Sequence, residues 1–122
     1  MAPRVIVVDD SMSVREQVAT VLGAAGFEVV QALDGEDALP KIRATPPPAL
    51  VISDVNMPRM NGIELLTAMK RDAALATIKF VMLTTEGQPT LIERAKQLGA
   101  NGWIVKPFKP DLLVAAVKKL TG

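Results

Sequence analysis

The sequence predicts an α/β protein in which one parallel β-sheet is covered by helices on both faces. Five short apolar segments alternate strictly with five amphipathic segments, which is the pattern of repeated strand–helix units. Three of the apolar segments are almost continuous runs of valine, isoleucine and leucine, as expected for strands that are buried on both faces. The chain has 122 residues, 49% of them hydrophobic, which suits one packed domain spanning residues 1–122.

The strands are predicted where short runs of apolar, mostly β-branched residues occur. The first run, RVIVV, stops at two adjacent aspartates, and the third, LVIS, stops at one. Because helices connect the strands by right-handed crossovers, the carboxyl ends of all strands should meet at one edge of the sheet. The predicted strands span residues 4–8, 28–32, 50–53, 79–83 and 103–105.

The first two helices are predicted from helical spacing and from their caps. Ser13 is the expected N-cap of the first helix, with Ser11 also well placed for this role, and Gly26 is the expected residue just beyond its end. Asp34 should cap the second helix. Pro40 should kink or shorten that helix, because proline removes a backbone donor and clashes with the preceding turn. These two helices are predicted at residues 14–26 and 34–44.

The other three helices follow the third, fourth and fifth strands. Ile63, Leu66 and Met69 form an apolar stripe at helical spacing, and Gly99 should end the fourth helix. Pro110 suits the first helical position of the fifth helix, where its missing N–H costs nothing. These helices are predicted at residues 61–72, 88–100 and 109–120.

Composition excludes several classes of function. The net charge is +1, from 14 basic and 13 acidic residues, whereas nucleic-acid binding needs a clustered basic excess. Cysteine and histidine are absent, which removes thiolate and imidazole groups as nucleophiles or metal ligands. No apolar segment approaches the roughly 20 residues that span a bilayer, and the N-terminus does not read as a signal peptide. We therefore expect a cytoplasmic protein that binds neither nucleic acid nor membrane.

Polar side chains gather at the carboxyl edge of the predicted sheet. Any one of them could be a helix cap or a solvated strand end. Ligands of open parallel sheets bind at this edge, so the convergence of five polar groups indicates a functional site. They are Asp9 and Asp10 after the first strand, Asp54 after the third, Thr84 after the fourth and Lys106 after the fifth.

The three aspartates need a cation. Two carboxylates about 4 Å apart repel by about 4 kcal/mol at an effective dielectric constant near 20, and one lysine does not neutralise three acids. Oxygen ligands without histidine or cysteine favour Mg²⁺, which completes its coordination with water and phosphate oxygens. Thr84 and Lys106 would suit a phosphoryl group, and a carboxylate can accept one. Asp54, alone at the end of the central strand, is the candidate acceptor.

Four segments resemble, in order and spacing, the signature segments of two-component response-regulator receiver domains: VIVVDDS, LVISDVNMPRMNG, VMLTTEG and GWIVKPF. The resemblance covers essentially the whole chain and is strongest to the stand-alone chemotaxis (CheY-like) type. It implies a flavodoxin-like, doubly wound, five-stranded parallel sheet of order 2-1-3-4-5 with five helices. It also implies a signalling switch that catalyses only its own phosphorylation and dephosphorylation.

The resemblance implies a phosphorylation and metal site. Asp54 is implied to be the phosphoacceptor. Mg²⁺ is implied to bind Asp10 and Asp54 directly and Asp9 mainly through a water molecule. The backbone carbonyl of Asn56 is implied to be a further ligand.

The resemblance also implies how the switch works. Thr84 is the implied switch hydroxyl, and Lys106 is implied to bind the phosphoryl oxygens and to precede a cis bond to Pro107. Trp103 takes the place of a rotating tyrosine or phenylalanine. That aromatic reports switching on the face formed by the fourth helix, the fifth strand and the fifth helix.

Four residues differ from the usual family pattern. Trp103 is bulkier than the usual aromatic and should turn less freely. Thr85 follows the switch hydroxyl where a smaller residue is common, and Asn61 replaces a frequent acid. Together with Pro40, these two should affect rates and partners, whereas Trp103 should affect the coupling step.

The leading hypothesis is a receiver domain without an output domain. Since the chain has no histidine, a sensor histidine kinase or a phosphotransfer protein would supply the phosphoryl group, and a downstream protein would receive the signal. A small phosphohydrolase of the haloacid-dehalogenase type would need a second acid at Asn56 and a cap insertion. A flavodoxin-like flavin binder would need a phosphate loop where DDSMSV stands, and more aromatics. A further alternative is a receiver fold that serves only as a protein-interaction module and is not phosphorylated.

Overall fold

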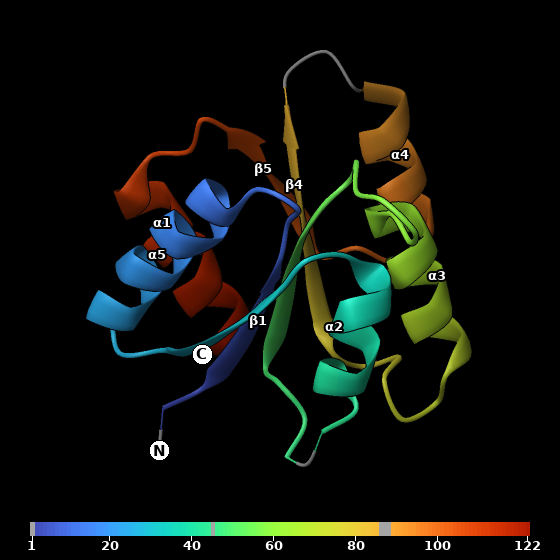
Figure 1. The fold of residues 1–122 in the computed structure, drawn as a ribbon, viewed down its shortest axis with the longest axis horizontal. Helices are drawn as coiled ribbons and strands as arrows, with labels where there is room; N and C mark the ends of the chain where they lie inside the picture. Colours follow the sequence, from blue (N-terminus) through green and yellow to red (C-terminus); the bar gives the residue numbers. More distant parts are fainter. Residues whose placement is uncertain (1, 45, 86–88) are drawn as a thin grey trace.

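The computed structural model describes residues 2–44, 46–85 and 89–122. Its strands form one parallel sheet in the order β2-β1-β3-β4-β5 (Figure 1), which confirms the predicted flavodoxin-like fold. The strands are β1 (Arg4–Val8), β2 (Glu28–Ala32), β3 (Leu50–Asp54), β4 (Lys79–Thr85) and β5 (Gly102–Lys106). The helices are α1 (Met12–Ala24), α2 (Gly35–Ile42), α3 (Gly62–Arg71), α4 (Pro89–Gln97) and α5 (Pro110–Thr121).

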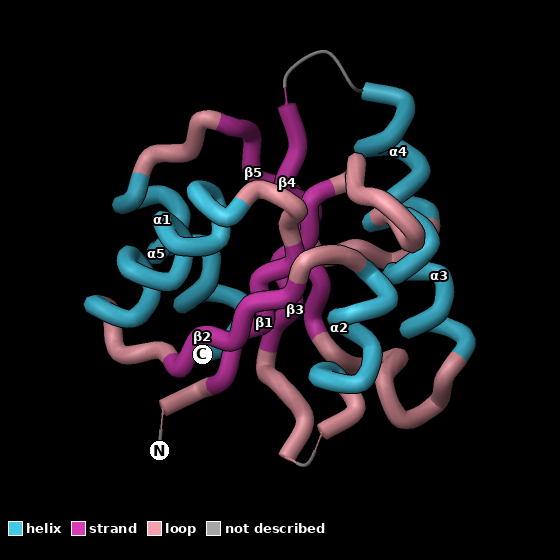
Figure 2. Tube along the Cα trace, viewed as in Figure 1, coloured by secondary structure: helices cyan, strands magenta, loops and turns pink. Residues whose placement is uncertain are grey.

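The helices lie in two layers on either side of the sheet. Helices α1 and α5 cover one face, and α2, α3 and α4 cover the other, as Figures 1 and 2 show. Strand β1 supplies both cores, because successive side chains on a strand point to opposite faces. Val5 and Val7 pack with α1 and α5, whereas Ile6 and Val8 pack with the three helices opposite. The near-continuous apolar runs in the sequence are therefore explained by burial on both faces.

The predicted strands are confirmed, with ends that differ by one or two residues. β3 includes Asp54, β4 continues through Thr84 and Thr85, and β5 continues to Lys106. The parallel ladder continues to these polar residues, since Asp54 pairs with Leu83 and Thr85 pairs with Lys106. Asp54, Thr84 and Lys106 thus belong to the strands themselves, whereas Asp9 and Asp10 follow the end of β1.

The helix ends correct one prediction and confirm others. Ser11, not Ser13, is the N-cap of α1, and its side chain accepts a hydrogen bond from the backbone N–H of Val14. The helix therefore begins earlier than predicted, and Ser13 lies inside it. Gly26 follows the helix with φ 98°, the left-handed conformation expected of a residue that ends a helix.

Helix α2 is short, as expected from the proline at position 40, and spans only eight residues. Asp34 caps it, as predicted. The predicted start of the fourth helix, residue 88, lies outside the described residues. Within them, α4 begins at Pro89. None of the helices in the described ranges is both long and apolar enough to cross a membrane.

Candidate functional site

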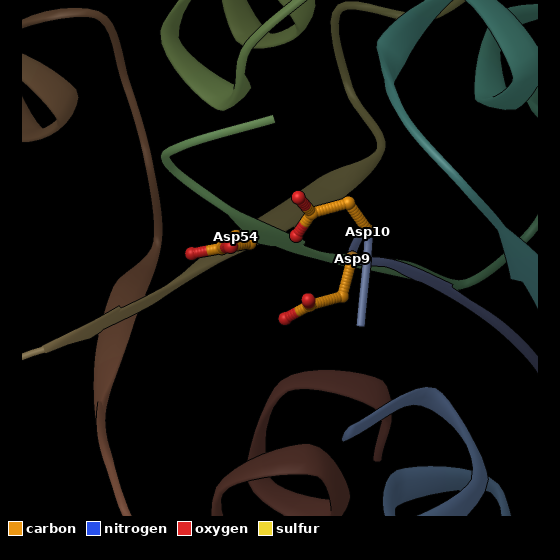
Figure 3. A group of neighbouring side chains, drawn as sticks. All are labelled: Asp9, Asp10 and Asp54. Carbon is orange, nitrogen blue, oxygen red and sulfur yellow. The ribbon is translucent and has the colours of Figure 1, made fainter. Parts of the chain in front are cut away.

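Three carboxylates meet where β1 and β3 end. The side chains of Asp9, Asp10 and Asp54 each offer an oxygen, and these oxygens lie within 4.8 Å of one another. Figure 3 shows the carboxylates of Asp9 and Asp10 extending to the side on which Asp54 lies. Asp9 is fully buried and Asp54 is nearly so, while Asp10 is exposed. The acids predicted at the edge of the sheet are therefore brought together, with one of them open to solvent.

Asp9 is fixed by its own turn and by α1. Its backbone N–H donates to the carbonyl of Ala32 at 3.1 Å, which continues the ladder to β2. Its Oδ1 accepts the backbone N–H of Ser11 at 2.9 Å. The guanidinium of Arg15 donates to its backbone carbonyl at 2.6 Å. These bonds involve Asp9 and Ser11, which lie on either side of Asp10 in the chain. The backbone that carries both aspartates therefore cannot turn without breaking one of the bonds.

Asp54 is held by its immediate neighbours in the chain. The backbone N–H of Val55 donates to Asp54 Oδ1 at 2.8 Å, and the hydroxyl of Ser53 donates to the Asp54 carbonyl at 2.9 Å. Gly62, at the start of α3, lies so close to that carbonyl oxygen that an added Cβ would overlap it. Glycine therefore allows α3 to pack directly behind the candidate acceptor.

Lys106 bridges two of the acids across the sheet. Its Nζ lies 2.9 Å from Asp9 Oδ2 and 3.3 Å from Asp54 Oδ1. These residues are far apart in the sequence, and the parallel strands bring them together as predicted. The following Lys106–Pro107 peptide bond is cis, which confirms that expectation.

The electrostatics of the site show an excess of negative charge. Burial raises the pKa of Asp54, and the charge of Asp9 raises it further, while Lys106 and the N–H of Val55 act in the opposite direction. Burial alone would lower the pKa of Lys106, but its hydrogen bond to Asp9 and the charges of Asp54 and Asp9 outweigh burial and raise it. One lysine therefore does not balance the acids, and the site favours a further cation.

The donor set fits a hard divalent cation. It consists of carboxylate oxygens from two neighbouring strand ends, and metals that prefer oxygen ligands bind such groups together with water. Exposed Asp10 leaves the cluster open on one side, where water or a phosphoryl oxygen could approach. Asn56 lies in the exposed loop two residues after Asp54, and the role of its carbonyl stays a prediction.

The two predicted switch residues lie on β4 and β5. Thr84 is buried and its hydroxyl donates to the carbonyl of Thr85 at 3.1 Å. It pairs with Val105, one position before Lys106, so it reaches the same edge of the sheet as the acids. Trp103 lies farther back on β5, 42% exposed, with the ammonium of Lys96 4.4 Å from its ring centroid.

Sequence reasoning missed the role of Arg15. This arginine is buried on the inner face of α1 together with Val18 and Leu22. A basic residue at helical spacing within an apolar face was the signal that could have identified it, since buried charges normally have a dedicated partner. Here the partner is the backbone of Asp9.

The sequence and the fold match known proteins over nearly the whole chain. Residues 5–118 match the response regulator receiver domain. A Rhizobium etli protein named as a probable chemotaxis protein CheY is 38% identical over 120 residues, which cover 98% of this chain and 92% of that protein. The Helicobacter pylori chemotaxis protein CheY1 is 35% identical, with 98% and 97% covered.

Solved structures are also similar to this chain in sequence and in fold. The chemotaxis response regulator CheY4 of Vibrio cholerae is 39% identical and superposes with a TM-score of 0.90, covering 98% of this chain and 99% of that one. NtrX from Brucella abortus is 32% identical with a TM-score of 0.89, and the match covers 99% of this chain but 28% of that protein. A domain of this fold thus occurs both in proteins of about the length of this chain and as part of a longer protein.

Proposed function

The chain belongs to the response regulator receiver domain family, and we propose that it is a switch that accepts a phosphoryl group on Asp54 with the help of Mg²⁺. The observation that carries this proposal is the convergence of Asp9, Asp10 and Asp54 with Lys106 between two of them. The raised pKa of Asp54 supports it, because burial and the neighbouring charge of Asp9 make the cluster favour added positive charge.

The proposed transfer joins a carboxylate oxygen of Asp54 to phosphorus. The donor is a phosphohistidine of a sensor kinase or phosphotransfer protein, because this chain has no histidine. The phosphorus–nitrogen bond breaks as the oxygen–phosphorus bond forms, and the imidazole leaves with a proton from solvent. In a separate hydrolysis step, water attacks phosphorus and the bond between phosphorus and the Asp54 oxygen breaks, which returns the carboxylate and releases inorganic phosphate. The protein thus catalyses only its own phosphorylation and dephosphorylation.

Individual residues have distinct tasks in this proposal. Asp10 and Asp54 would bind Mg²⁺ directly, Asp9 would hold it mainly through water, and the Asn56 carbonyl would complete the protein ligands. Bound there, Mg²⁺ would neutralise negative charge on the phosphoryl oxygens. Lys106 can leave its bridge between the carboxylates and bond to a phosphoryl oxygen, since its ammonium already lies 3.3 Å from Asp54.

The proposed switch links Asp54 to the face formed by α4, β5 and α5. A phosphoryl group adds about 1.5 to 2 negative charges and strong acceptors, which would draw in the hydroxyl of Thr84. Movement of Thr84 would give the ring of Trp103 room to turn inward from its exposed position. A downstream protein would then bind the altered face.

We also propose that residues 1–122 act as one receiver unit in the cytoplasm. The chemotaxis names of the relatives from Rhizobium etli and Helicobacter pylori support signalling in chemotaxis or motility, with a phosphorelay as the alternative setting.

The test uses the single tryptophan as a reporter. Beryllofluoride or acetyl phosphate is added with MgCl₂, and the fluorescence of Trp103 is recorded in the wild type and in Asp54→Asn. We expect a saturable change in the wild type only, and its loss when the metal is chelated. No change in the wild type, or an equal change in Asp54→Asn, would overturn the proposed function.

A further inference from the structure

The loop between Asp54 and α3 contains a strained turn. Arg59 has φ 63°, and the backbone N–H of Met60 donates to the carbonyl of Pro58 at 2.7 Å. A hydrogen bond across one residue with positive φ defines the rarer and more strained form of γ-turn. Such a conformation persists at a residue other than glycine only where surrounding contacts hold it. The contacts that hold Arg59 should therefore matter for the loop.

The side chain of Arg59 reaches from this turn to the start of α2. Its guanidinium pairs with Asp34, whose side chain is fully buried, and its Nε lies 3.5 Å from Glu36 Oε2. Oδ1 of Asp34 is already used as the cap of α2, where it accepts the N–H of Asp37 at 3.0 Å. Oδ2 has no hydrogen-bond partner other than Arg59 among the described residues. Asp34 therefore serves two elements at once, with one oxygen for each.

A backbone contact reinforces the same junction. The N–H of Gly35 donates to the carbonyl of Met60 at 3.0 Å. A Cβ on residue 35 would come within 2.5 Å of Met60 Cγ, so glycine is what allows the loop to lie against α2. The turn at Arg59 is thus fixed on both sides, by its side chain to Asp34 and by the next carbonyl to Gly35.

The remainder of the loop is short and its ends are also fixed. Val55 donates its N–H to the carboxylate of Asp54, and its carbonyl accepts the N–H of Gly62 at 3.0 Å. Between these anchors lie Asn56 and the turn at Arg59. If the turn were released, Asn56 is the part of the loop that would gain freedom next to the acid cluster.

We propose that Arg59 is a positioning residue for the metal site: by pairing with Asp34 it holds the loop from Val55 to Met60 in the form that receives the cation. This inference rests on the proposed function, in which Asp54 and the carbonyl of Asn56 bind Mg²⁺. Arg59 acts through the loop, because its ion pairs are with Asp34 and Glu36 and not with the three clustered aspartates. A structural ion pair without this role would contribute stability and leave metal affinity unchanged.

The test compares Mg²⁺ affinities of metal-free proteins by titration with MgCl₂, followed through backbone amide NMR shifts. The variants are Arg59→Ala, which removes the guanidinium, and Arg59→Gly, which also removes the backbone strain and so should fold. We expect dissociation constants about tenfold higher in both, the lower end of what loss of an outer-shell partner causes. Arg43→Ala is the matched control. Arg43 is similarly exposed and pairs with Asp72 away from the site, so its removal should leave the affinity unchanged.

A second readout needs no metal. Amide hydrogen exchange of Gly35, whose N–H bonds to Met60, should be faster in Arg59→Gly and unchanged in Arg43→Ala. If the wild type binds Mg²⁺ and both Arg59 variants bind it equally well, the positioning role is overturned and the proposed function stands. If the wild type shows no Mg²⁺-dependent shifts, both proposals fail.

Discussion

Replacing Asp54 with asparagine should stabilise the metal-free protein even though it removes the proposed phosphoacceptor. Asparagine has nearly the same shape and keeps an Oδ1 that can accept the N–H of Val55, which Asp54 does at 2.8 Å. The variant therefore removes the charge and little else. What changes is the balance between the buried carboxylate, its acidic neighbour Asp9 and the ammonium of Lys106.

The size of the effect follows from that balance. Oxygens of Asp9 and Asp54 lie within 4.8 Å, where two unit charges repel by about 3–4 kcal/mol at an effective dielectric constant near 20. Lys106 offsets much of this repulsion, but its Nζ is closer to Asp9 than to Asp54. Burial of Asp54 then leaves its pKa raised, so its charge destabilises the folded protein near neutral pH. We expect Asp54→Asn to raise the free energy of unfolding by about 1–2 kcal/mol, which is the part of the repulsion that Lys106 does not offset.

The sign of the pH dependence follows from the same shift. Because the pKa of Asp54 is raised in the folded protein above its ordinary 3.8, the folded state takes up a proton at a higher pH than the unfolded chain does. The penalty for the charge is thus present above the raised pKa and disappears as the pH falls toward 3.8. Metal-free wild type should approach Asp54→Asn in stability on mild acidification.

The assay is urea unfolding, followed by circular dichroism, in EDTA and in MgCl₂. Mg²⁺ at about 100 times its dissociation constant should stabilise the wild type by about 2.7 kcal/mol, and Asp54→Asn by much less, so the order of stability should reverse. Asp111→Asn, in the first turn of α5, is the control. It should lose about 0.3–1 kcal/mol through the helix dipole and leave the Mg²⁺ effect intact. A less stable Asp54→Asn in EDTA, or an equal gain of both proteins with Mg²⁺, would refute the reasoning.

Two further variants test packing at the acceptor and restraint of the tryptophan. Gly62→Ala should destabilise the protein by about 1–3 kcal/mol, because its Cβ would overlap the Asp54 carbonyl oxygen. Gly23→Ala, with nothing within 4 Å of the added Cβ, should not destabilise it, and equal urea midpoints would contradict this. Lys96→Ala should lower the beryllofluoride concentration for half-maximal fluorescence change by about two- to fivefold, because a cation over the Trp103 ring is worth about 0.5–1 kcal/mol. An unchanged half-maximal concentration would show that Lys96 does not restrain the ring.

The sheet and the residues at its edge could be predicted because they depend on periodicity and on one topological rule. The alternation of apolar and amphipathic segments gives parallel strands, and right-handed crossovers place their carboxyl ends together. That rule alone brings Lys106 to Asp9 across 97 positions of sequence. No knowledge of the loops is needed for this part of the site.

The loops could not be predicted in the same way, since their contacts follow no period. The capping box that Asn61 and Glu64 form at the start of α3 is an exception, because these residue types three positions apart are a local signature. The pairing of Arg59 with Asp34 has no local signature at all. It depends on a strained turn in one loop and on the exact approach of a helix from another part of the chain. Ser11 and Ser13 could not be distinguished as the cap of α1 from the sequence, because they are chemically equivalent and differ only in backbone position.

The central claim is that Asp54 receives the phosphoryl group, and chemical location of that group tests it most directly. The protein is incubated with acetyl phosphate and MgCl₂, the acyl phosphate is reduced with borohydride, and the peptides are analysed by mass spectrometry. We expect modification at residue 54 alone, dependent on Mg²⁺ and absent from Asp54→Asn. Modification at another aspartate, or equal labelling with EDTA in place of MgCl₂, would contradict it.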